Sequence, residues 1–553
     1  MKSFRRVFVF AAVLALVGLA LGGAAAQAGT SLPLPGCTSA TDWAMFGHDP
    51  GRSFSSPDAC IGTAGAATLR PKWFFNTSAP VTAQPVVAGG TLYVGDFTGK
   101  FHALNAADGT ERWSFDIHKY DNDHADYSAI SDSAAFTTIH GRHFVVFGGG
   151  ATLFVLDADH NGALVSLQCL DRVDTTCQGL SGYTTEIESS PVLVPNGNGA
   201  QDILVGTDVN EHDPSGPTGL YDVTLAPDGS LTPKWQFDPE TGITNSVATT
   251  GHALPPAQPA PGSEHGCGDV WSSPTVVGGL AVFGTGNCDQ PNEVTSTATK
   301  HVESTFAVHV SDGSLAWQAT PHTPYTCDAS GNCSGLDLDF GATANALPAA
   351  AGAAVGEGGK DGVYHAYNSD GTPAWQTQVA TASDIGGMIG STAVGKLGAL
   401  HNNDPAVFAA TAIPVSDIDP QSSIQNDLQN PNQAFGVHAI DAVTHKVVWD
   451  APAGPAYGAA VYNNGVVFVP DTFTDSLMAF DADTGAILRV QPLDAPPSSP
   501  VAISGNSLYM GAGTTEGGAS VTSDPTALLT DPSGSAFGAL AGFGGVWGFT
   551  TTP

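Results

Sequence analysis

Short apolar runs separated by glycine turns recur along most of this chain. In residues 90–115, "GTLYVGDFTGKFHALNAADGTERWSF", two β-rich runs flank a glycine turn, and an Asp-Gly turn then leads to Trp113. Asp-Gly between alternating apolar runs is a strong hairpin signal, because both residues tolerate the left-handed backbone of tight hairpin turns. Each such stretch therefore predicts one hairpin of a small antiparallel sheet.

The pattern returns at intervals along the chain. Close copies span residues 305–318, 362–377, 435–450 and 476–490, and looser copies span residues 152–167 and 219–237. One hairpin cannot bury its faces alone, so neighbouring units must stack. With four strands per unit, and an eighth unit from residues 505–513 closed by an N-terminal strand near residues 42–49, the repeats predict an all-β, eight-bladed β-propeller. The repeated Trp is expected to pack between blades.

Composition agrees with many short strands. Only 12% of the 553 residues are charged, while 67 are Gly, which favours turns and strands over long helices. The net charge of −35 argues against a nucleic-acid partner, whose phosphates require Lys and Arg.

The two ends of the chain differ from the repeats. Residues 1–28 have a basic start, an apolar run and an Ala-Gln-Ala ending, which predicts a secretory signal peptide and a secreted or periplasmic protein. No second long apolar segment follows, so no membrane span is expected. The propeller is assigned to residues 35–515, and the Gly/Ala/Ser/Thr-rich residues 516–553 to a C-terminal tail.

Eight cysteines remain after the leader, an even number for an oxidising compartment. We expect disulfides between sequence neighbours: Cys37 with Cys60, Cys169 with Cys177, Cys267 with Cys288 and Cys327 with Cys333. No CxxCH motif occurs, so an attached c-type haem is not expected.

One stretch departs from the repeat. Residues 270–287, "VWSSPTVVGGLAVFGTGN", place Trp271 outside the repeated Trp position and end on an amide, Asn287. Gly-Asn can simply form a turn, and Trp271 can simply pack between blades. The alternative is a ligand site at the end of a propeller channel.

The blades resemble the pyrroloquinoline quinone (PQQ) repeat, and "DWAMFGHDPGRS" resembles the start of that superfamily. Three further stretches, "VWSSPTVVGGLAVFGTGN", "TCDASGNCSGLDLDFGATANAL" and "GEGGKDGVYHAY", resemble the quinoprotein alcohol dehydrogenases, most closely the polyvinyl-alcohol dehydrogenase type. The resemblance implies an eight-bladed propeller that holds PQQ and calcium and oxidises an alcohol.

The resemblance also implies particular site residues. Trp271 would stack on the flat cofactor, and Lys360 would lie beside its quinone oxygens. Asn287 and Glu211 match metal and cofactor ligands, with Asp208 an alternative to Glu211. Calcium prefers such mixed carboxylate and amide oxygens.

The sequence offers several candidates for the catalytic base. The family stretch "TPHDEWD" reads "TPHTPYT" here, and the nearest acids are Asp328, Asp337 and Asp339. Asp339 or Asp337 is expected to act as base, Asp339 also as a metal ligand, with His322 an alternative base because imidazole titrates near neutrality. The adjacent-cysteine disulfide of many relatives is absent, and residues 127–136 offer no counterpart to the arginine that usually contacts PQQ.

Two functions remain open on the sequence alone. One is a secreted enzyme that oxidises an alcohol, secondary or polymeric, with PQQ and calcium and passes electrons to an external acceptor such as a cytochrome c. The other is a non-catalytic PQQ-like propeller that serves as a scaffold or ligand-binding module. Fold alone does not decide between them.

Overall fold

A computed structural model describes most of the chain after residue 40. The described residues are 41–58, 60–120, 130–171, 185–197, 199–209, 218–255, 267–287, 302–323, 326–327, 333–334, 337–382, 386–412, 436–472, 474–513 and 544–551. They all belong to one compact unit. The predicted signal peptide lies outside them and stays a prediction.

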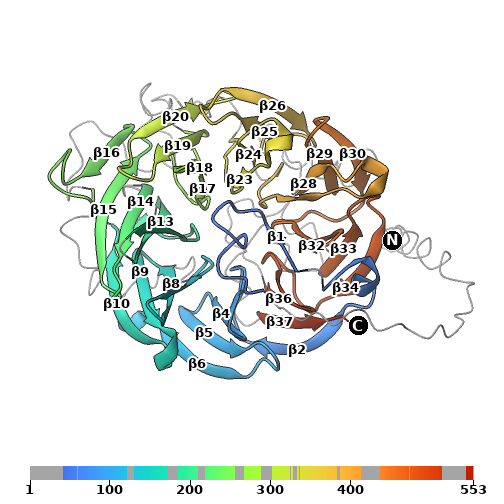
Figure 1. Cartoon of the computed structure of the whole chain (residues 1–553), viewed down its shortest axis with the longest axis horizontal. Coiled ribbons are helices and arrows are strands. Elements are labelled where there is room, and N and C mark those ends of the chain that lie inside the picture. Colours follow the sequence, from blue (N-terminus) through green and yellow to red (C-terminus); the bar gives the residue numbers. More distant parts are fainter. Residues whose placement is uncertain are drawn as a thin grey trace, which may run out of the picture. The chain divides into compact units, whose positions relative to one another are not determined.

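The unit is an eight-bladed β-propeller, which confirms the predicted fold (Figure 1). In the first seven blades the four main strands pair antiparallel in chain order; in the fourth and fifth blades, Figure 1 shows the first strands, β17 and β23, facing the axis. The first four blades consist of β3 (Val86–Ala88), β4 (Thr91–Gly95), β5 (Lys100–Asn105) and β6 (Glu111–Asp116); β7 (Ala135–Ile139), β8 (Arg142–Gly149), β9 (Thr152–Asp157) and β10 (Ala163–Cys169); β12 (Val192–Gly197), β13 (Ala200–Val209), β14 (Gly219–Leu225) and β15 (Leu231–Asp238); and β17 (Thr275–Val277), β18 (Leu280–Gly284), β19 (Thr305–His309) and β20 (Leu315–Ala319).

The next three blades follow the same order. They consist of β23 (Asn345–Ala346), β24 (Val355–Gly358), β25 (Val363–Tyr367) and β26 (Pro373–Gln378); β27 (Ala393–Lys396), β28 (Pro405–Ala410), β29 (Val437–Asp441) and β30 (Lys446–Ala451); and β31 (Val461–Asn463), β32 (Val466–Asp471), β33 (Ser476–Asp481) and β34 (Ile487–Pro492). Smaller elements are β1 (Ser55–Ser56), α2 (Thr63–Ala66), β11 (Thr185–Glu186), β16 (Ile243–Ser246), β21 (Thr326–Cys327) and β22 (Cys333–Ser334).

The eighth blade joins the two ends of the described chain. It consists of β35 (Ala502–Ser504), β36 (Ser507–Ala512), β37 (Gly545–Thr550) and, outermost, β2 (Arg70–Asn76). The expected closing strand near residues 42–49 is therefore wrong, because β2 occupies that place. The boundary at residue 515 is also too early, because β37 belongs to the propeller.

The repeated Trp packs between blades, as predicted. Trp317 of the fourth blade lies on Gly371 in the last hairpin turn of the fifth, and a Cβ at Gly371 would lie 2.5 Å from the indole. Four more junctions place a Trp within 2.7 Å of the corresponding position: Trp73 on Gly109, Trp113 on Gly162, Trp235 on Gly313 and Trp449 on Gly485. Glycine at these turns therefore serves packing as well as hairpin geometry.

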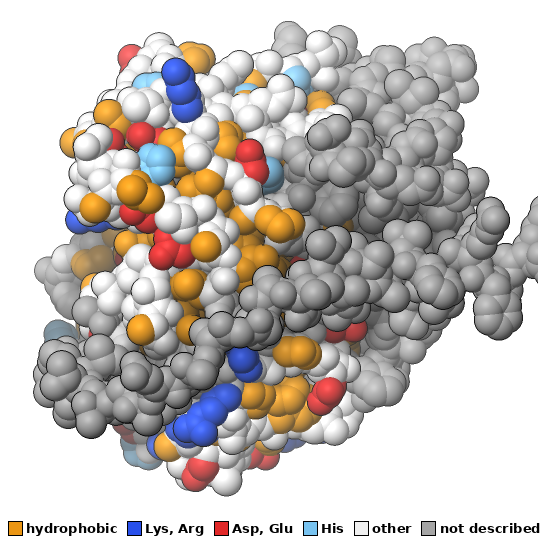
Figure 2. All heavy atoms as spheres, turned by 90° about the vertical axis from the view of Figure 1, so that its right-hand side faces the viewer, with side chains coloured by type: hydrophobic (Ala, Val, Ile, Leu, Met, Phe, Trp, Pro, Cys, Tyr) orange, Lys and Arg blue, Asp and Glu red, His pale blue; other side chains and the backbone are white. Residues whose placement is uncertain are grey.

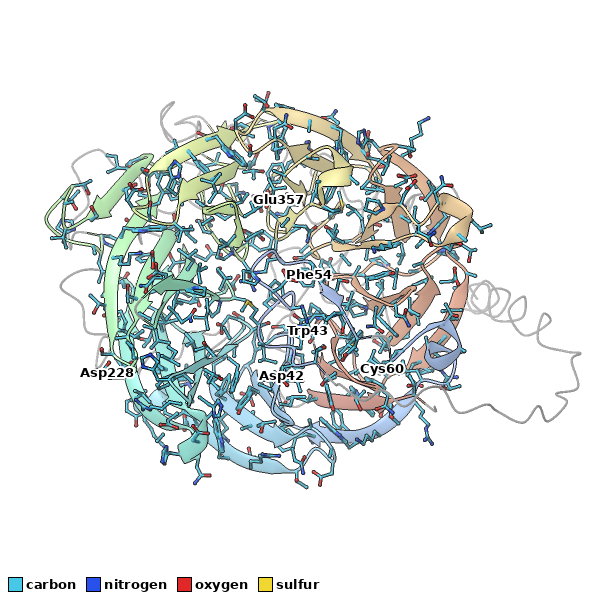
Figure 3. The ribbon with its side chains drawn as sticks, in the orientation of Figure 1. Asp42, Trp43, Phe54, Cys60, Asp228 and Glu357 are labelled. Atoms are coloured by element: carbon cyan, nitrogen blue, oxygen red, sulfur yellow. The ribbon has the colours of Figure 1, made fainter. Side chains whose placement is uncertain are left out.

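The N-terminal segment, residues 41–58, runs along the inner strands of the ring. Its backbone pairs successively with blades one, two, four, five, six and seven, through Val87, Phe136, Val276, Ala346, Val394 and Tyr462. Figure 3 shows its residues Trp43 and Phe54 near the middle of the ring, and both are fully buried. Residues 42–49, expected to form a blade strand, thus lie along the inner strands near the axis instead.

None of the cysteines in the described residues is free, and Cys60, Cys169 and Cys267 are disulfide-bonded. Their expected partners Cys37, Cys177 and Cys288 lie outside the described residues, so that pairing stays a prediction. In the β21–β22 ribbon, Cys327 stands opposite Cys333.

Within the described part of the chain, no helix combines the length and apolar character needed to cross a bilayer. Figure 2 shows one edge of the ring, where acidic and basic side chains are interspersed with apolar ones.

Two glycines test the contribution of the Trp contact. Gly371 and Gly279 have left-handed φ values of +80° and +82°, but a Cβ at Gly279 would meet no atom within 4 Å. We expect Gly279→Ala to cost about 1–2 kcal/mol of backbone strain, and Gly371→Ala to cost a further ~1–3 kcal/mol because the methyl displaces Trp317. Denaturant unfolding of both variants measures the difference, and equal losses would contradict the packing role.

Candidate active site

Four loops of the fourth and fifth blades meet at one end of the ring. In a four-stranded antiparallel blade, the entry to strand one and the turn between strands two and three lie at the same edge. Backbone hydrogen bonds of 2.9–3.2 Å link these loops: Gly286 donates to Asp269, Phe340 to Thr285 and Lys360 to Asp339. Glu303 donates to Gly286 across the base of the loop between β18 and β19, at 3.0 Å. The repeat architecture thereby fixes the positions of the side chains these loops carry.

Trp271 lies against glycine on two sides. A Cβ at Gly341 would fall 1.5 Å from the indole ring, and a Cβ at Gly286 would fall 3.1 Å from its Nε1. The position of the indole therefore requires glycine at 341 and leaves little space for a Cβ at 286. Within "GTGN", which follows the end of β18, Gly286 is thus packed closely against Trp271.

A compact charge cluster lies beside Trp271. The Lys360 ammonium donates to both carboxylate oxygens of Asp337, at 3.3 and 3.2 Å, and to Oδ2 of Asp339. Asp339 and Lys360 are buried, while Asp337 is partly exposed. Burial acts to lower the pKa of Lys360, but the Asp339 and Asp337 carboxylates outweigh it and raise that pKa, so the lysine stays charged.

The other oxygen of Asp339 is available. Oδ1 is buried and has no hydrogen-bond partner among the described residues, and a Cβ at Gly286 would lie 3.5 Å from it. Burial, and then repulsion from Asp339, raise the pKa of Asp337 well above its usual range. Two carboxylates thus compete for one lysine in this cluster.

Glu303 joins the same cluster and escaped the sequence analysis. It is fully buried, and its carboxylate lies within 4.8 Å of those of Asp337 and Asp339. It also lies 3.5 Å from Nδ1 of His322, whose ring stacks on Phe340. Burial lowers the pKa of His322. Three carboxylates facing one lysine leave a negative site that suits a cation.

Glu303 has an unusual backbone for its residue type. Its φ of +46° lies in the left-handed region, which costs a non-glycine residue about 1–2 kcal/mol. In the sequence it stands at the start of an ordinary repeat strand, "ESTFAVHV". Its position two residues before the strand, at the edge that carries the site loops, was the one available signal.

The remaining expected residues are only partly located. The carbonyl of Asn287 accepts a hydrogen bond of 2.9 Å from Gly268, next to Gly286 in the same loop. Glu211 and Asp328 lie outside the described residues, so their roles stay predictions. Asp208, the alternative to Glu211, stands opposite Glu186 in the β11–β13 pair.

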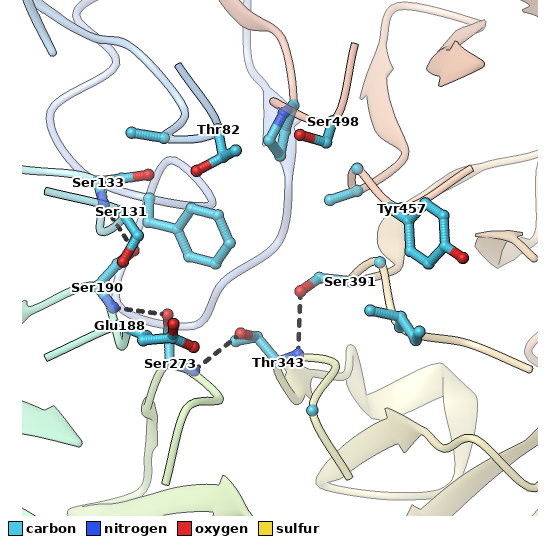
Figure 4. Close-up of a pocket in the computed structure, with 18 of the residues that line it drawn as sticks. Thr82, Ser131, Ser133, Glu188, Ser190, Ser273, Thr343, Ser391, Tyr457 and Ser498 are labelled. Atoms are coloured by element: carbon cyan, nitrogen blue, oxygen red, sulfur yellow. Dashed lines mark hydrogen bonds between the residues drawn. The ribbon is translucent and has the colours of Figure 1, made fainter. Parts of the chain in front are cut away.

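A cavity of about 160 Å³ lies between Trp271 and the N-terminal segment. Trp271 and Gly341 belong to its wall, together with Phe46 of that segment. Much of the rest is hydroxyl-bearing, including Ser190, Ser273 and Thr343 (Figure 4). The aromatic platform therefore adjoins a cavity whose wall carries several hydroxyl groups.

Comparison with known sequences supports a specific family. A family model described as "Glucose/ethanol/alcohol dehydrogenase, beta-propeller domain", with the short name PQQ, matches residues 43–323, just over half of the chain. No curated protein matches the chain in sequence.

Solved structures share the fold at low identity. Quinohemoprotein alcohol dehydrogenase from Comamonas testosteroni is 17% identical with a TM-score of 0.59, over 92% of this chain and 80% of that chain. A europium-containing methanol dehydrogenase is 13% identical with a TM-score of 0.60, over 92% and 98%. The quinohemoprotein alcohol dehydrogenase ADHIIG from Pseudomonas putida HK5 is 15% identical with a TM-score of 0.60, over 92% and 80%.

The raised pKa of Asp337 predicts a pH-dependent cost to the cofactor-free fold. A carboxyl whose folded pKa exceeds the ordinary value of about 3.9 stabilises the fold below that pH, and this stability is lost as pH rises through the folded pKa. We therefore expect Asp337→Asn to raise the melting temperature more at pH 8 than at pH 4. Thermal unfolding of this variant and of the exposed control Asp494→Asn measures it, and an equal change at both pH values would contradict it.

Proposed function

The chain belongs to the family of glucose, ethanol and alcohol dehydrogenase β-propeller domains, and from this premise we propose that it is a quinoprotein alcohol dehydrogenase. Its cofactors are PQQ and calcium, and it passes electrons to an external acceptor such as a cytochrome c. The substrate is a secondary or polymeric alcohol of the polyvinyl-alcohol kind. The protein acts outside the cytoplasm after removal of residues 1–28.

One observation carries the proposal: Lys360 and Asp339 are buried together, with Asp337, beside an indole that two glycines accommodate. Moving a charged group from water into the protein interior costs on the order of several kcal/mol per ion, and the attraction between opposite charges must offset this cost. A propeller that served only as a scaffold would gain nothing from three such groups at one end of its axis. Strongly perturbed, partly buried charges are typical of catalytic sites.

The residues fit the proposed groups. Trp271 offers an aromatic platform for a flat conjugated cofactor, and the adjoining cavity offers hydroxyl donors for its carboxylates. The unpartnered Oδ1 of Asp339 and the excess of carboxylates over lysine suit a divalent cation. Asn287 and Glu211 complete the proposed metal and cofactor ligands, and Glu303 is near enough to assist Asp339.

The chain's own groups supply orientation and proton transfer. When bound, PQQ supplies a two-electron acceptor and calcium a Lewis acid. Asp339 takes the proton of the substrate hydroxyl as general base, and Lys360 holds that carboxylate in place and stabilises negative charge near it. Asp337 competes with Asp339 for Lys360 and so weakens the interaction between Lys360 and Asp339. His322 is the alternative base.

The first test is binding and turnover. The mature chain is titrated with PQQ in the presence of calcium, following tryptophan fluorescence, and then assayed for dye reduction that depends on a secondary alcohol. We expect both binding and turnover, with calcium required for turnover. Binding without turnover would leave a ligand-binding module, and the absence of binding would leave a scaffold.

Substitution at the charge cluster assigns the base. We expect Asp339→Asn to lower kcat by about 10²–10⁴-fold while PQQ still binds, because general base catalysis contributes on that order. Asp337→Asn and His322→Gln test the other two candidates for the base, and each should retain more activity than Asp339→Asn. Loss of turnover in His322→Gln with activity retained in Asp339→Asn would assign the base to the histidine instead.

A further inference from the structure

A chain of hydrogen bonds runs around the axis through the residues that precede each innermost strand. Gln84, Ser133, Ser190, Ser273 and Thr343 each donate a backbone N–H to the hydroxyl of the corresponding residue in the next blade, over 2.8–3.2 Å, and the chain ends on Ser391 (Figure 4). Five hydroxyls thus act as acceptors between six successive blades. We call Ser133, Ser190, Ser273, Thr343 and Ser391 the hydroxyl arc.

The hydroxyl protons of the arc are available for hydrogen bonds to a ligand. None of its five hydroxyls donates a hydrogen bond to any described residue, although all five residues are more than nine-tenths buried and line the axial cavity. The buried Ser131 Oγ, also in the cavity wall, has no partner among the described residues. Six hydroxyl protons therefore face one small cavity.

Water alone does not equalise the numbers of hydrogen-bond donors and acceptors in such a site. Each water adds two donors together with its two acceptor positions, so an excess of donors persists, whereas a carboxylate oxygen only accepts. An unmet buried donor costs about 1–3 kcal/mol. The cavity contents that satisfy the hydroxyl arc best are therefore acceptor-only groups.

A buried cation lies behind the wall. Arg52 is fully buried, and its guanidinium donates to the carbonyls of Ser190 and Pro274 at 2.9 Å and to that of Phe46. It lies 5.5 Å from the centre of the Phe46 ring, which belongs to the cavity wall. Burial lowers the pKa of Arg52 to about 9, with Asp49 opposing, which leaves it charged at neutral pH.

The cavity is also asymmetric. The seventh and eighth blades place Ala459 and Pro500 where the other blades carry hydroxyls or Gln84, and both line the cavity. Glu188 is the one carboxylate among the lining residues that the structure describes, and it is partly exposed. A ligand would therefore turn its acidic edge toward the hydroxyl arc and its apolar edge toward the seventh and eighth blades.

We propose that the hydroxyl arc is a carboxylate-binding site, which positions a flat aromatic ligand bearing several carboxylates by donating O–H bonds to them over the charge of Arg52. The proposal rests on the proposed function in that the ligand would be the quinone cofactor. The arc would then provide the contacts that the missing arginine of residues 127–136 does not.

Two adjacent serines give a matched test. Ser190 and Ser189 are both buried, and each accepts one backbone N–H, from Ser133 at 2.9 Å and from Gly206 at 3.0 Å, but only Ser190 lines the cavity. Calorimetry measures the binding of PQQ with calcium, and of benzene-1,2,4-tricarboxylate as a probe without a quinone. Thermal unfolding checks that both Ser→Ala variants fold.

We expect Ser190→Ala to weaken both ligands about tenfold or more, as for a lost hydrogen bond to a charged group, and Ser189→Ala to leave both unchanged. Glu188→Gln should tighten both, because a like charge is removed. Tricarboxylate binding with this pattern but no PQQ turnover would support the site and reject the enzyme. PQQ turnover with equal affinity in the two serine variants would overturn the site and keep the enzyme, and failure of the tricarboxylate and PQQ to bind would overturn the site.

Discussion

Eight sheets can share one axis only if the side chains that meet there are small. Seven of the eight innermost strands are preceded, two residues earlier, by Ser, Thr, Ala or Pro, and the N-terminal segment fills the space that remains. Small residues cannot supply a hydrophobic core by themselves, so the blades are joined at the axis by hydrogen bonds and at the rim by Trp on glycine turns. Hydrogen bonds thus join neighbouring blades close to the axis, and Trp packing joins them far from it.

The site follows from that division. At the site the backbones of neighbouring loops bond to each other, and glycine there leaves room for a large side chain. Trp271 takes that room over Gly341 and Gly286. The same close approach brings Asp337, Asp339 and Lys360 together out of water, where their interactions are stronger than at the surface. The geometry that closes the ring thus also concentrates charge.

Much of this architecture is visible in the sequence, because hairpin turns and a repeated Trp are local signals. Trp271, Asp339 and Lys360 could be singled out because their motifs resemble those of a family, and the structure brings them within one cluster. Glu303 could not, since its sequence context is that of any repeat strand and its left-handed backbone is apparent only in the structure.

The closing strands were hidden for other reasons. "DWAMFGHD" has the apolar content of a strand, but His48 and Gly47 take left-handed conformations that break it. β2 begins with Arg and Pro, and β37 lies within a Gly-rich region. Strand pairing between the two ends of a chain leaves no local pattern, so sequence periodicity cannot identify it.

The eighth blade has a consequence for the order in which the protein is made. Its outer strand β2 is synthesised early, but its partner β37 follows the strands of all seven other blades in the chain. Seven blades can therefore stack while the ring is still an open arc, with β2 unpaired until β37 has been synthesised. An open arc exposes a strand edge that favours pairing with other chains. Folding would thus end in a single closing event, in which β37 pairs with β36 on one side and with β2 on the other.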